Sequence, residues 1–300
     1  MDACVRVFAI ALLVGQMGMA RAADGIAQGK QECRSRAEPG SDAAACAAEN
    51  SNRPNGDTEA VEMTVGSPPM QSDDTGTPGP GNWEINLGMY GDLTGGERLF
   101  DFPTIDINYG YGESVQFAFT LPVVFTQQAQ PEANGIMRKV DGWTLGQSQV
   151  GVKYRFYDDK EMGLSFALYP QIQFRTPGAG KSVPGGNTVL AVPMLATWEF
   201  ERVSVTANAG IEAAAGKHFT FASVGIGTRL TDRVALLAEV VGENLNAADE
   251  KVVLFDIGIR RKITDRQSVS AALGRDLDVG GDQHEHTYFA IAYQMLFGQH

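Results

Sequence analysis

The chain has little cysteine, with only three among its 300 residues. Cys4 lies close to the N-terminus, which leaves Cys33 and Cys46 as a pair without a nearby histidine. Two thiols are too few ligands for a tetrahedral zinc site, so no metal centre is expected there. In an oxidising compartment an even pair at short spacing often forms a disulfide. We therefore expect Cys33 and Cys46 to be bonded to each other.

Basic residues are also scarce. The sequence holds 24 Lys and Arg against 36 Asp and Glu, which gives a formal net charge of −12. Proteins that bind nucleic acid need a basic footprint to meet the phosphates. The charge balance therefore argues against a nucleic-acid partner.

Long apolar runs are absent beyond the first residues, and none reaches the roughly 18 residues of a membrane-spanning helix. The N-terminus carries Arg6, a short apolar stretch at Val7–Val14, and the small residues Ala20 and Ala22 around Arg21. A charged start, an apolar middle and an A-x-A site are typical of a secretory signal peptide. Residues 1–22 are therefore predicted to be removed on export.

Aromatic residues are almost missing from residues 23–81, which are rich in Ala, Gly, Ser, Asn, Asp and Pro. Such a segment cannot bury enough apolar surface to offset the entropy that ordering costs. We expect a flexible, mostly disordered N-terminal segment in the periplasm over 23–81, followed by a folded domain over 82–300.

The strongest pattern that is present lies in Val150–Arg175, where apolar and polar residues alternate on both sides of a charged turn. Val152 and Phe156 share one face of the first run, and Lys153 and Arg155 share the other. The runs approach the roughly 9–11 residues of a tilted strand that crosses a membrane. This pattern indicates lipid on one side of the sheet and a polar lumen on the other.

Similar runs recur from Asn82 onwards and predict an all-β fold, a transmembrane antiparallel up-and-down β-barrel of about 12 strands. The predicted strands are 82–91, 102–110, 114–125, 146–157, 164–175, 188–199, 202–212, 219–230, 233–243, 251–261, 267–276 and 287–297.

Short and long connections alternate between these strands, as they do in bacterial outer-membrane barrels with periplasmic turns and external loops. Short turns are predicted at 110–114, 158–161, 199–202, 231–233 and 264–266, and longer loops at 92–101, 127–143, 176–187, 213–218, 243–250 and 277–286. An even number of strands places both chain termini in the periplasm. The predicted location is therefore the outer membrane.

Polar residues on the inward face are the candidate binding and selectivity residues, because lumen side chains decide which solutes pass. They are Glu84, Asn86, Asp106, Asn108, Gln116, Lys153, Arg155, Gln171, Gln173, Arg175, Arg229, Glu239, Asp256 and Arg260. Lys153, Arg155 and Arg175 are expected to form one positive wall. The alternative is that these residues only form polar ladders that hold the barrel together. The lumen is further expected to be narrowed by 127–143 or by the N-terminal segment.

Several stretches resemble the outer-membrane transporter family named for the MetA pathway of phenol degradation. They are Gly81–Gly88, Ile107–Gln116 with Leu121-Pro122, Gln149–Phe156, Tyr169-Pro170 leading to Thr176–Gly178, and Leu230–Val234 with Glu239. The resemblance covers about residues 80–297 and implies an outer-membrane β-barrel that passes small, often aromatic or hydrophobic, compounds. It implies no catalytic residues, and the family's Pro-Thr-Gly order is changed here at Thr176–Gly178.

Other chemistry has weaker support. Gly178–Ser182 resembles the end of a phosphate-binding loop, but Arg175 stands where the motif needs glycine. Asp282, His284, Glu285 and His286 contain alternate histidines that could ligate a metal, although a solvated loop tip is the commoner explanation.

The alternatives to a passive channel are a lipid-modifying hydrolase of the outer membrane and a structural or adhesive barrel. A hydrolase would need a His–Ser or His–Thr pair, and the candidates are His218 near Thr220 and Ser223, and His286 near Thr287. We predict a channel that is not an enzyme, uses no cofactor, and meets outer-membrane lipid, a small-molecule solute and the barrel-assembly machinery as partners.

Overall fold

The computed structural model describes residues 71–94, 97–131, 137–179, 187–248, 251–280 and 286–298, without the side chains of 97 and 126–141. Every regular element in these ranges is a β-strand, and they contain no helix long and apolar enough to cross a bilayer. The predicted signal peptide, the Cys33–Cys46 disulfide, the loop residues 282–285 and most of the Gly178–Ser182 motif lie outside the described residues.

The strands are β1 (Trp83–Thr94), β2 (Glu97–Tyr111), β3 (Val115–Pro131), β4 (Met137–Leu145), β5 (Gln147–Asp159), β6 (Leu164–Leu168), β7 (Gln171–Arg175), β8 (Val189–Glu199), β9 (Val203–Ala214), β10 (Lys217–Thr231), β11 (Val234–Glu243), β12 (Val252–Thr264), β13 (Gln267–Val279) and β14 (His286–Phe297).

These segments make twelve passes along the barrel wall, because two passes are interrupted. Gly146 separates β4 from β5, and both halves pair with β3. Tyr169 and Pro170 separate β6 from β7, and both halves lie between β5 and β8. Proline has no backbone N–H for the ladder, which explains the second break. The prediction of twelve strands is confirmed.

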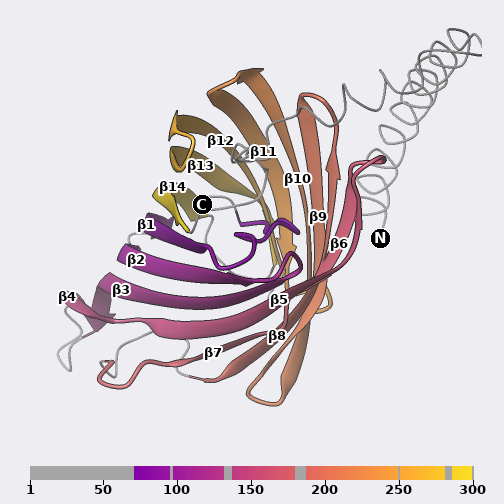
Figure 1. Ribbon diagram of the computed structural model, residues 1–300. Helices are drawn as coiled ribbons and strands as arrows, with labels where there is room; N and C mark the ends of the chain where they lie inside the picture. Colours follow the sequence, from indigo (N-terminus) through magenta and orange to yellow (C-terminus); the bar gives the residue numbers. More distant parts are fainter. Residues whose placement is uncertain are drawn as a thin grey trace, which may run out of the picture. The chain divides into compact units, whose positions relative to one another are not determined.

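The sheet closes on itself (Figure 1). β1 pairs antiparallel with β2 on one side and with β14 on the other, from Trp83↔Phe297 to Thr94↔His286. All other neighbours are also antiparallel and follow chain order. The fold is therefore a closed, up-and-down, transmembrane-type β-barrel, as the sequence predicts.

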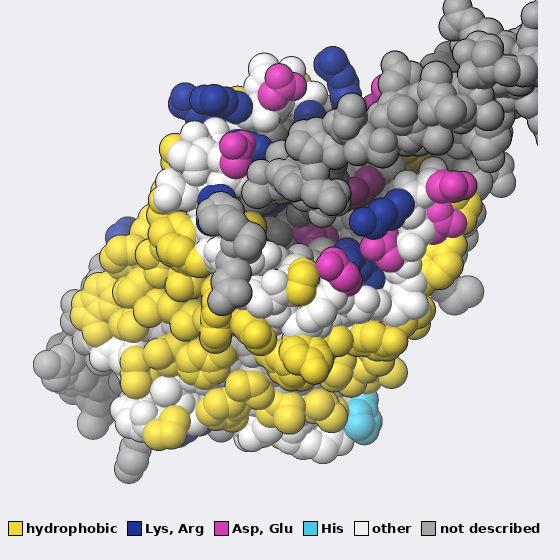
Figure 2. Space-filling model, viewed as in Figure 1, with side chains coloured by type: hydrophobic (Ala, Val, Ile, Leu, Met, Phe, Trp, Pro, Cys, Tyr) yellow, Lys and Arg dark blue, Asp and Glu magenta, His cyan; other side chains and the backbone are white. Residues whose placement is uncertain are grey.

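The two faces of the wall differ in chemistry. Val152 and Phe119 point outward and are each 39% exposed, whereas the neighbouring Lys153 points into the lumen and is 2% exposed. Figure 2 shows the outward side chains as a broad hydrophobic belt, with charged side chains gathered around the opening. An apolar exterior of this kind matches a hydrocarbon environment and would be a liability in water.

The barrel has a short-turn end, made by the connections 112–114, 160–163, 200–202, 232–233 and 265–266, and a long-loop end opposite. β1 starts and β14 finishes at the short-turn end. Three of the loops predicted at the long-loop end are wrong, and two of these are short connections between long strands. Residues 92–101 and 213–218 are mostly strand, with only 95–96 and 215–216 between the paired strands.

The loop predicted at 127–143 is also mostly strand, because β3 and β4 continue to pair as far as Pro131↔Met137. Backbone pairing continues where the side chains become polar, and the polar composition alone therefore suggested a loop. This hairpin extends the wall instead of folding into the lumen.

The outward register gives a prediction about stability. Phe119→Arg should lower the free energy of unfolding by about 2–4 kcal/mol, because it places a charge in the hydrocarbon. Gln173→Arg, on the inward face of β7, is the matched control and should cost much less. Urea unfolding in lipid vesicles, followed by tryptophan fluorescence, measures both. Equal costs for the two variants would contradict the assigned register.

Candidate functional site

The lumen of the barrel contains a piece of the chain itself. Residues 71–81, which the composition assigns to the flexible N-terminal segment, run inside the barrel before β1 begins (Figure 1). We call them the lumen segment. Ser72, Asp74 and Thr75 are each 4% exposed or less, so the segment is buried against the wall. The lumen side chains described next explain how so polar a stretch is held in place.

The first residues of the lumen segment are anchored on β10 and β11. The Glu239 carboxylate accepts hydrogen bonds from two successive backbone amides, those of Gln71 and Ser72, the latter at 2.9 Å. The Ser72 hydroxyl donates to the Ser223 hydroxyl at 2.7 Å. A carboxylate that receives two amides is held by charge-assisted hydrogen bonds, which are stronger than neutral ones.

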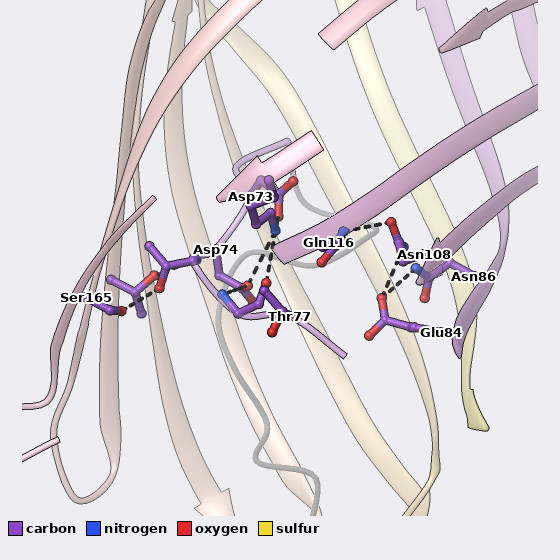
Figure 3. Close-up of polar contacts among 12 residues, drawn as sticks. Asp73, Asp74, Thr77, Glu84, Asn86, Asn108, Gln116 and Ser165 are labelled. Atoms are coloured by element: carbon purple, nitrogen blue, oxygen red, sulfur yellow. Dashed lines mark hydrogen bonds and ion pairs between the residues drawn. The ribbon is translucent and has the colours of Figure 1, made fainter. Parts of the chain in front are cut away.

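The middle of the segment is anchored on β5, β6 and β8 (Figure 3). Lys153 Nζ lies 2.7 Å from Asp73 Oδ1 and 4.0 Å from Asp74 Oδ1. The Thr75 amide donates to Thr197 Oγ1 at 3.1 Å, and the Thr75 hydroxyl hydrogen-bonds to Ser165. The segment therefore follows the inner wall from β11 to β5.

The last residues of the segment lead into β1 at the short-turn end. The Gly81 amide donates to the Gly110 carbonyl at 2.9 Å, and the Gly110 amide donates to the Asn82 carbonyl at 2.9 Å. A Cβ added at Gly110 would lie 1.9 Å from the Gly79 carbonyl oxygen. Glycine at 110 is therefore needed for the segment to pass this strand.

Lys153 is buried at the centre of these contacts. Its ammonium meets the Asp73 carboxylate and also lies 5.0 Å from the centroid of the Tyr169 ring, which is a favourable cation–π distance. Tyr169 is itself 4% exposed and packs with Ala118, Ala167 and Leu195. The segment therefore supplies the charge that a buried ammonium requires.

Burial raises the pKa of Asp73 to about 6, against the lowering effect of the Lys153 ammonium. A carboxyl group whose pKa is higher in the docked state takes up a proton on docking. Its contribution to docking is therefore largest at pH values below its ordinary pKa of 3.8 and is lost as the pH rises above about 6. The Asp73 side chain is still 37% exposed, so water moderates this preference. The contribution of Asp73 to docking is therefore larger under mildly acidic conditions than at neutral pH.

A second polar network covers the inward faces of β1, β2 and β3 (Figure 3). Asn86 donates to Glu84 at 3.0 Å and to Asp106 at 2.9 Å. Asn108 donates to Asp106 at 2.7 Å and accepts from Gln116 at 2.7 Å. The side-chain amides of Asn86 and Asn108 therefore lie between the carboxylates of Glu84 and Asp106 and hydrogen-bond to both.

The structure places the predicted lumen residues in different groups. One hydrogen-bond network contains Glu84, Asn86, Asp106, Asn108 and Gln116. The lumen segment is held by Lys153 and Glu239. On β7, the side chain of Gln173 donates to Gln149 at 2.9 Å, beside Gln171. Asp256 and Arg260 are buried on the inward face of β12. Their roles in binding or selectivity stay predictions.

The positive wall expected from Lys153, Arg155 and Arg175 is wrong. Arg155 donates to the Glu113 carbonyl at the short-turn end, and Arg175 donates to the Ala179 carbonyl at the long-loop end. Arg175 is level with Gln147, eight residues before Arg155, which separates the two by roughly 26 Å along the strand. Arg229 also lies at the short-turn end, where it donates to the Glu201 carbonyl.

Sequence reasoning missed the acidic residues of the long-loop half. Asp92 on β1 and Asp276 on β13 are inward, with His286 joining them. His286 Nδ1 lies 3.0 Å from Asp92 Oδ2, and its amide donates to Asp276 at 2.9 Å. Asp101 on β2 faces the same space. Extending the inward alternation beyond the predicted strand ends would have found Asp92 and His286, and Asp276 ends a predicted strand. Asp101 turns inward because the register shifts between Asp101 and Thr104, which alternation does not predict.

The described contacts of His286, and the positions of His218 and Ser223, differ from those of a catalytic triad. His286 contacts both Asp92 and the Thr94 hydroxyl through the same nitrogen, Nδ1, whereas a catalytic triad uses one ring nitrogen for each partner. His218 and Ser223 lie an odd number of residues apart on β10, so they face opposite sides of the sheet. Among the described residues, no group of Asp, Glu, His and Cys could hold a metal ion.

A closed barrel with an apolar exterior and a polar, partly filled lumen defines the class of membrane β-barrels. Residues 67–288 match the family described as "Putative MetA-pathway of phenol degradation". The match covers most of the sequence, and the chain belongs to this family. A comparison with curated protein sequences gives no match.

A solved structure with a similar fold supports the architecture. The chain is similar to the COG4313 outer membrane channel from Pseudomonas putida F1, with a TM-score of 0.60 and 10% identity over 75% of this chain and 98% of that one. Weaker similarities are to the KdgM porin, with a TM-score of 0.49 and 9% identity over 71% and 99%, and to the Pseudomonas putida toluene transporter TodX, with a TM-score of 0.41 and 11% identity over 73% and 89%. Only the first is close enough to support a shared architecture.

The anchoring by Glu239 gives a second prediction. Glu239→Ala removes the acceptor for two amides of the lumen segment, so hydrogen exchange across residues 71–76 should accelerate about tenfold or more. Glu243→Ala, four residues further along the same inward face, is the matched control and should leave exchange unchanged. Exchange measured by mass spectrometry on the detergent-solubilised protein decides this. Unchanged exchange in Glu239→Ala would show that the segment is held by other contacts.

Proposed function

We propose that the protein is an outer-membrane channel for the passive passage of small molecules. The observation that carries this proposal is a polar lumen inside a closed barrel whose outer face is apolar. Polar side chains inside a lipid-facing wall are what a water-filled path requires. Membership of the family named for phenol degradation supports solutes that include aromatic compounds.

The orientation in the membrane is part of the proposal. Short turns face the periplasm in outer-membrane barrels, which would place the start of β1 and the end of β14 on that side. The predicted signal peptide supports export by the same route. Outer-membrane lipid would contact the hydrophobic belt, and the barrel-assembly machinery would insert the folded chain.

The lumen segment would act as the constriction. It occupies the short-turn half of the lumen and is hydrogen-bonded to six strands of the wall, β2, β5, β6, β8, β10 and β11. A solute would pass between the segment and the remaining wall, or would require the segment to move. Either route makes the segment the part of the path that limits flow.

Conductance tests this proposal directly. In planar bilayers the purified protein should form channels, and deletion of residues 71–79 should raise the single-channel conductance severalfold because the constriction is lost. Deletion of residues 53–61, which shortens the chain equally, is the matched control and should leave conductance unchanged. Folded protein that gives no channels in either form would overturn the channel proposal, and equal conductance of both deletions would overturn the constriction.

Ion preference gives a further prediction. Carboxylates line the long-loop half of the lumen, so the channel should prefer cations, because charged walls set selectivity. Glu243→Gln combined with Asp276→Asn should reduce that preference. Asp232→Asn combined with Asp265→Asn, on the short turns, is the control and should leave it unchanged. Reversal potentials across a salt gradient measure the preference, and an anion-selective wild type would contradict the prediction.

A further inference from the structure

A cavity of about 120 Å³ lies in the long-loop half of the lumen, next to Gln71 at the start of the lumen segment. By the same measure one water molecule needs roughly a tenth of that space, so a small organic molecule fits. The wall comes from β1, β2, β12, β13 and β14, and Gln71 of the lumen segment contributes to it. The site is therefore assembled from the seam that closes the barrel and from the segment inside it.

Three carboxylates line this cavity, from Asp92, Asp101 and Asp256, and no Lys or Arg side chain is among the described residues that line it. His286 partners Asp92. Asp101 and Asp256 each keep one buried carboxylate oxygen, Oδ1, without a hydrogen-bond partner, although Asp256 is only 6% exposed. Buried carboxylate oxygens without a donor are costly, so they are suited to an incoming positive group.

The side chain opposite Asp256 on the neighbouring strand carries no positive charge. Glu239 pairs with Asp256 across β11 and β12, is another carboxyl group, and shares a side-chain hydrogen bond with it. The Glu239 oxygens already accept the amides of Gln71 and Ser72. This partner therefore brings no positive charge to the cavity, and Asp256 Oδ1 keeps no hydrogen-bond partner.

The rest of the lining is aromatic and apolar. Tyr90 of β1 and Tyr288 of β14 lie on neighbouring strands, and Leu99, Ala272 and Ala290 add apolar surface. The Tyr90 ring lies over Gly88, where a Cβ would be 2.8 Å from the ring. Aromatic faces attract organic cations and accommodate ring-shaped bodies.

We propose that this cavity binds a small organic cation, an ammonium carried on an aromatic or other apolar body. The ammonium would donate to the free oxygens of Asp101 and Asp256, and the body would pack against Tyr90, Leu99 and Tyr288. A hard metal ion needs a shell of six or more oxygens, which an aromatic wall cannot supply. The inference rests on the proposed channel function only in that it identifies a class of solute.

Binding to the purified protein in detergent, measured by isothermal titration calorimetry at neutral pH, tests this with three probes of similar shape. Benzylamine should bind, benzyl alcohol should bind about tenfold or more weakly, and benzoate should not bind. Equal affinities for benzylamine and benzyl alcohol would overturn the proposal. Displacement of benzylamine by micromolar calcium would overturn it as well, because the site would then be a metal site.

The carboxylates are tested by isosteric variants. Asp101→Asn and Asp256→Asn should each weaken benzylamine binding about tenfold or more, and Tyr90→Leu should weaken it severalfold. Asp232→Asn, on a turn at the other end of the barrel, is the matched control and should bind like wild type. If Asp256→Asn fails to form the barrel, Asp101→Asn decides the question alone, and unchanged binding in it overturns the proposal.

Failure of this inference is distinguishable from failure of the channel function, because the titration needs no membrane. Protein that binds benzylamine but gives no current in bilayers would retain the site and contradict the channel. Protein that conducts but does not bind benzylamine would retain the channel and contradict the site.

Discussion

The pairing of β1 with β14 is the constraint on which the rest of the structure depends. In hydrocarbon an unpaired backbone N–H or C=O costs several kcal/mol, so a sheet that spans a membrane must have no open edge. Closure also fixes the register, because a slip of one residue would exchange the inward and outward faces of a strand. Lys153 is buried in the lumen and Val152 faces outward for this reason, and the chemistry of the lumen follows from it.

Closure creates a second requirement, since charges that face a narrow lumen are partly removed from water. Lys153 and Glu239 meet this requirement through the lumen segment, which supplies Asp73 and Asp74 to one and two backbone amides to the other. The segment has too little apolar surface to fold alone. Contacts with the barrel wall hold the lumen segment in place, and groups of the segment compensate the buried charges of Lys153 and Glu239.

The barrel was predictable from the sequence because the alternation of faces is a local property of each strand. Val150–Arg175 showed it clearly, and twelve passes followed. The strand ends at 92–101, 127–143 and 213–218 were not predictable in this way, because backbone pairing continues beyond the apolar face. The N-terminal segment was one of two candidates for narrowing the lumen, but the order of residues 71–81 was missed for a different reason. Their composition is that of a flexible segment, and only the positions of Lys153, Glu239 and Thr197 on three separate strands order them.

The candidate site, too, was only partly predictable, because alternation along one strand does not show which strands meet. Alternation places Lys153, Arg155 and Arg175 on the same face of their strands, yet it carries no information on height along the barrel. Arg155 and Arg175 therefore lie at opposite ends. The cavity depends on Asp101 and Asp256 from strands that are far apart in sequence, and only the closed seam brings them to one space.

The cavity and the lumen segment are physically linked through the neighbouring carboxyls of Glu239 and Asp256. A cation held at Asp256 would reduce the repulsion between the two groups. Glu239 is the acceptor for the amides of Gln71 and Ser72. Because coupling between two binding equilibria is reciprocal, docking of the segment would in turn strengthen cation binding. An occupied cavity would thus hold the constriction in place, so a bound cation would slow its own passage until the segment is released.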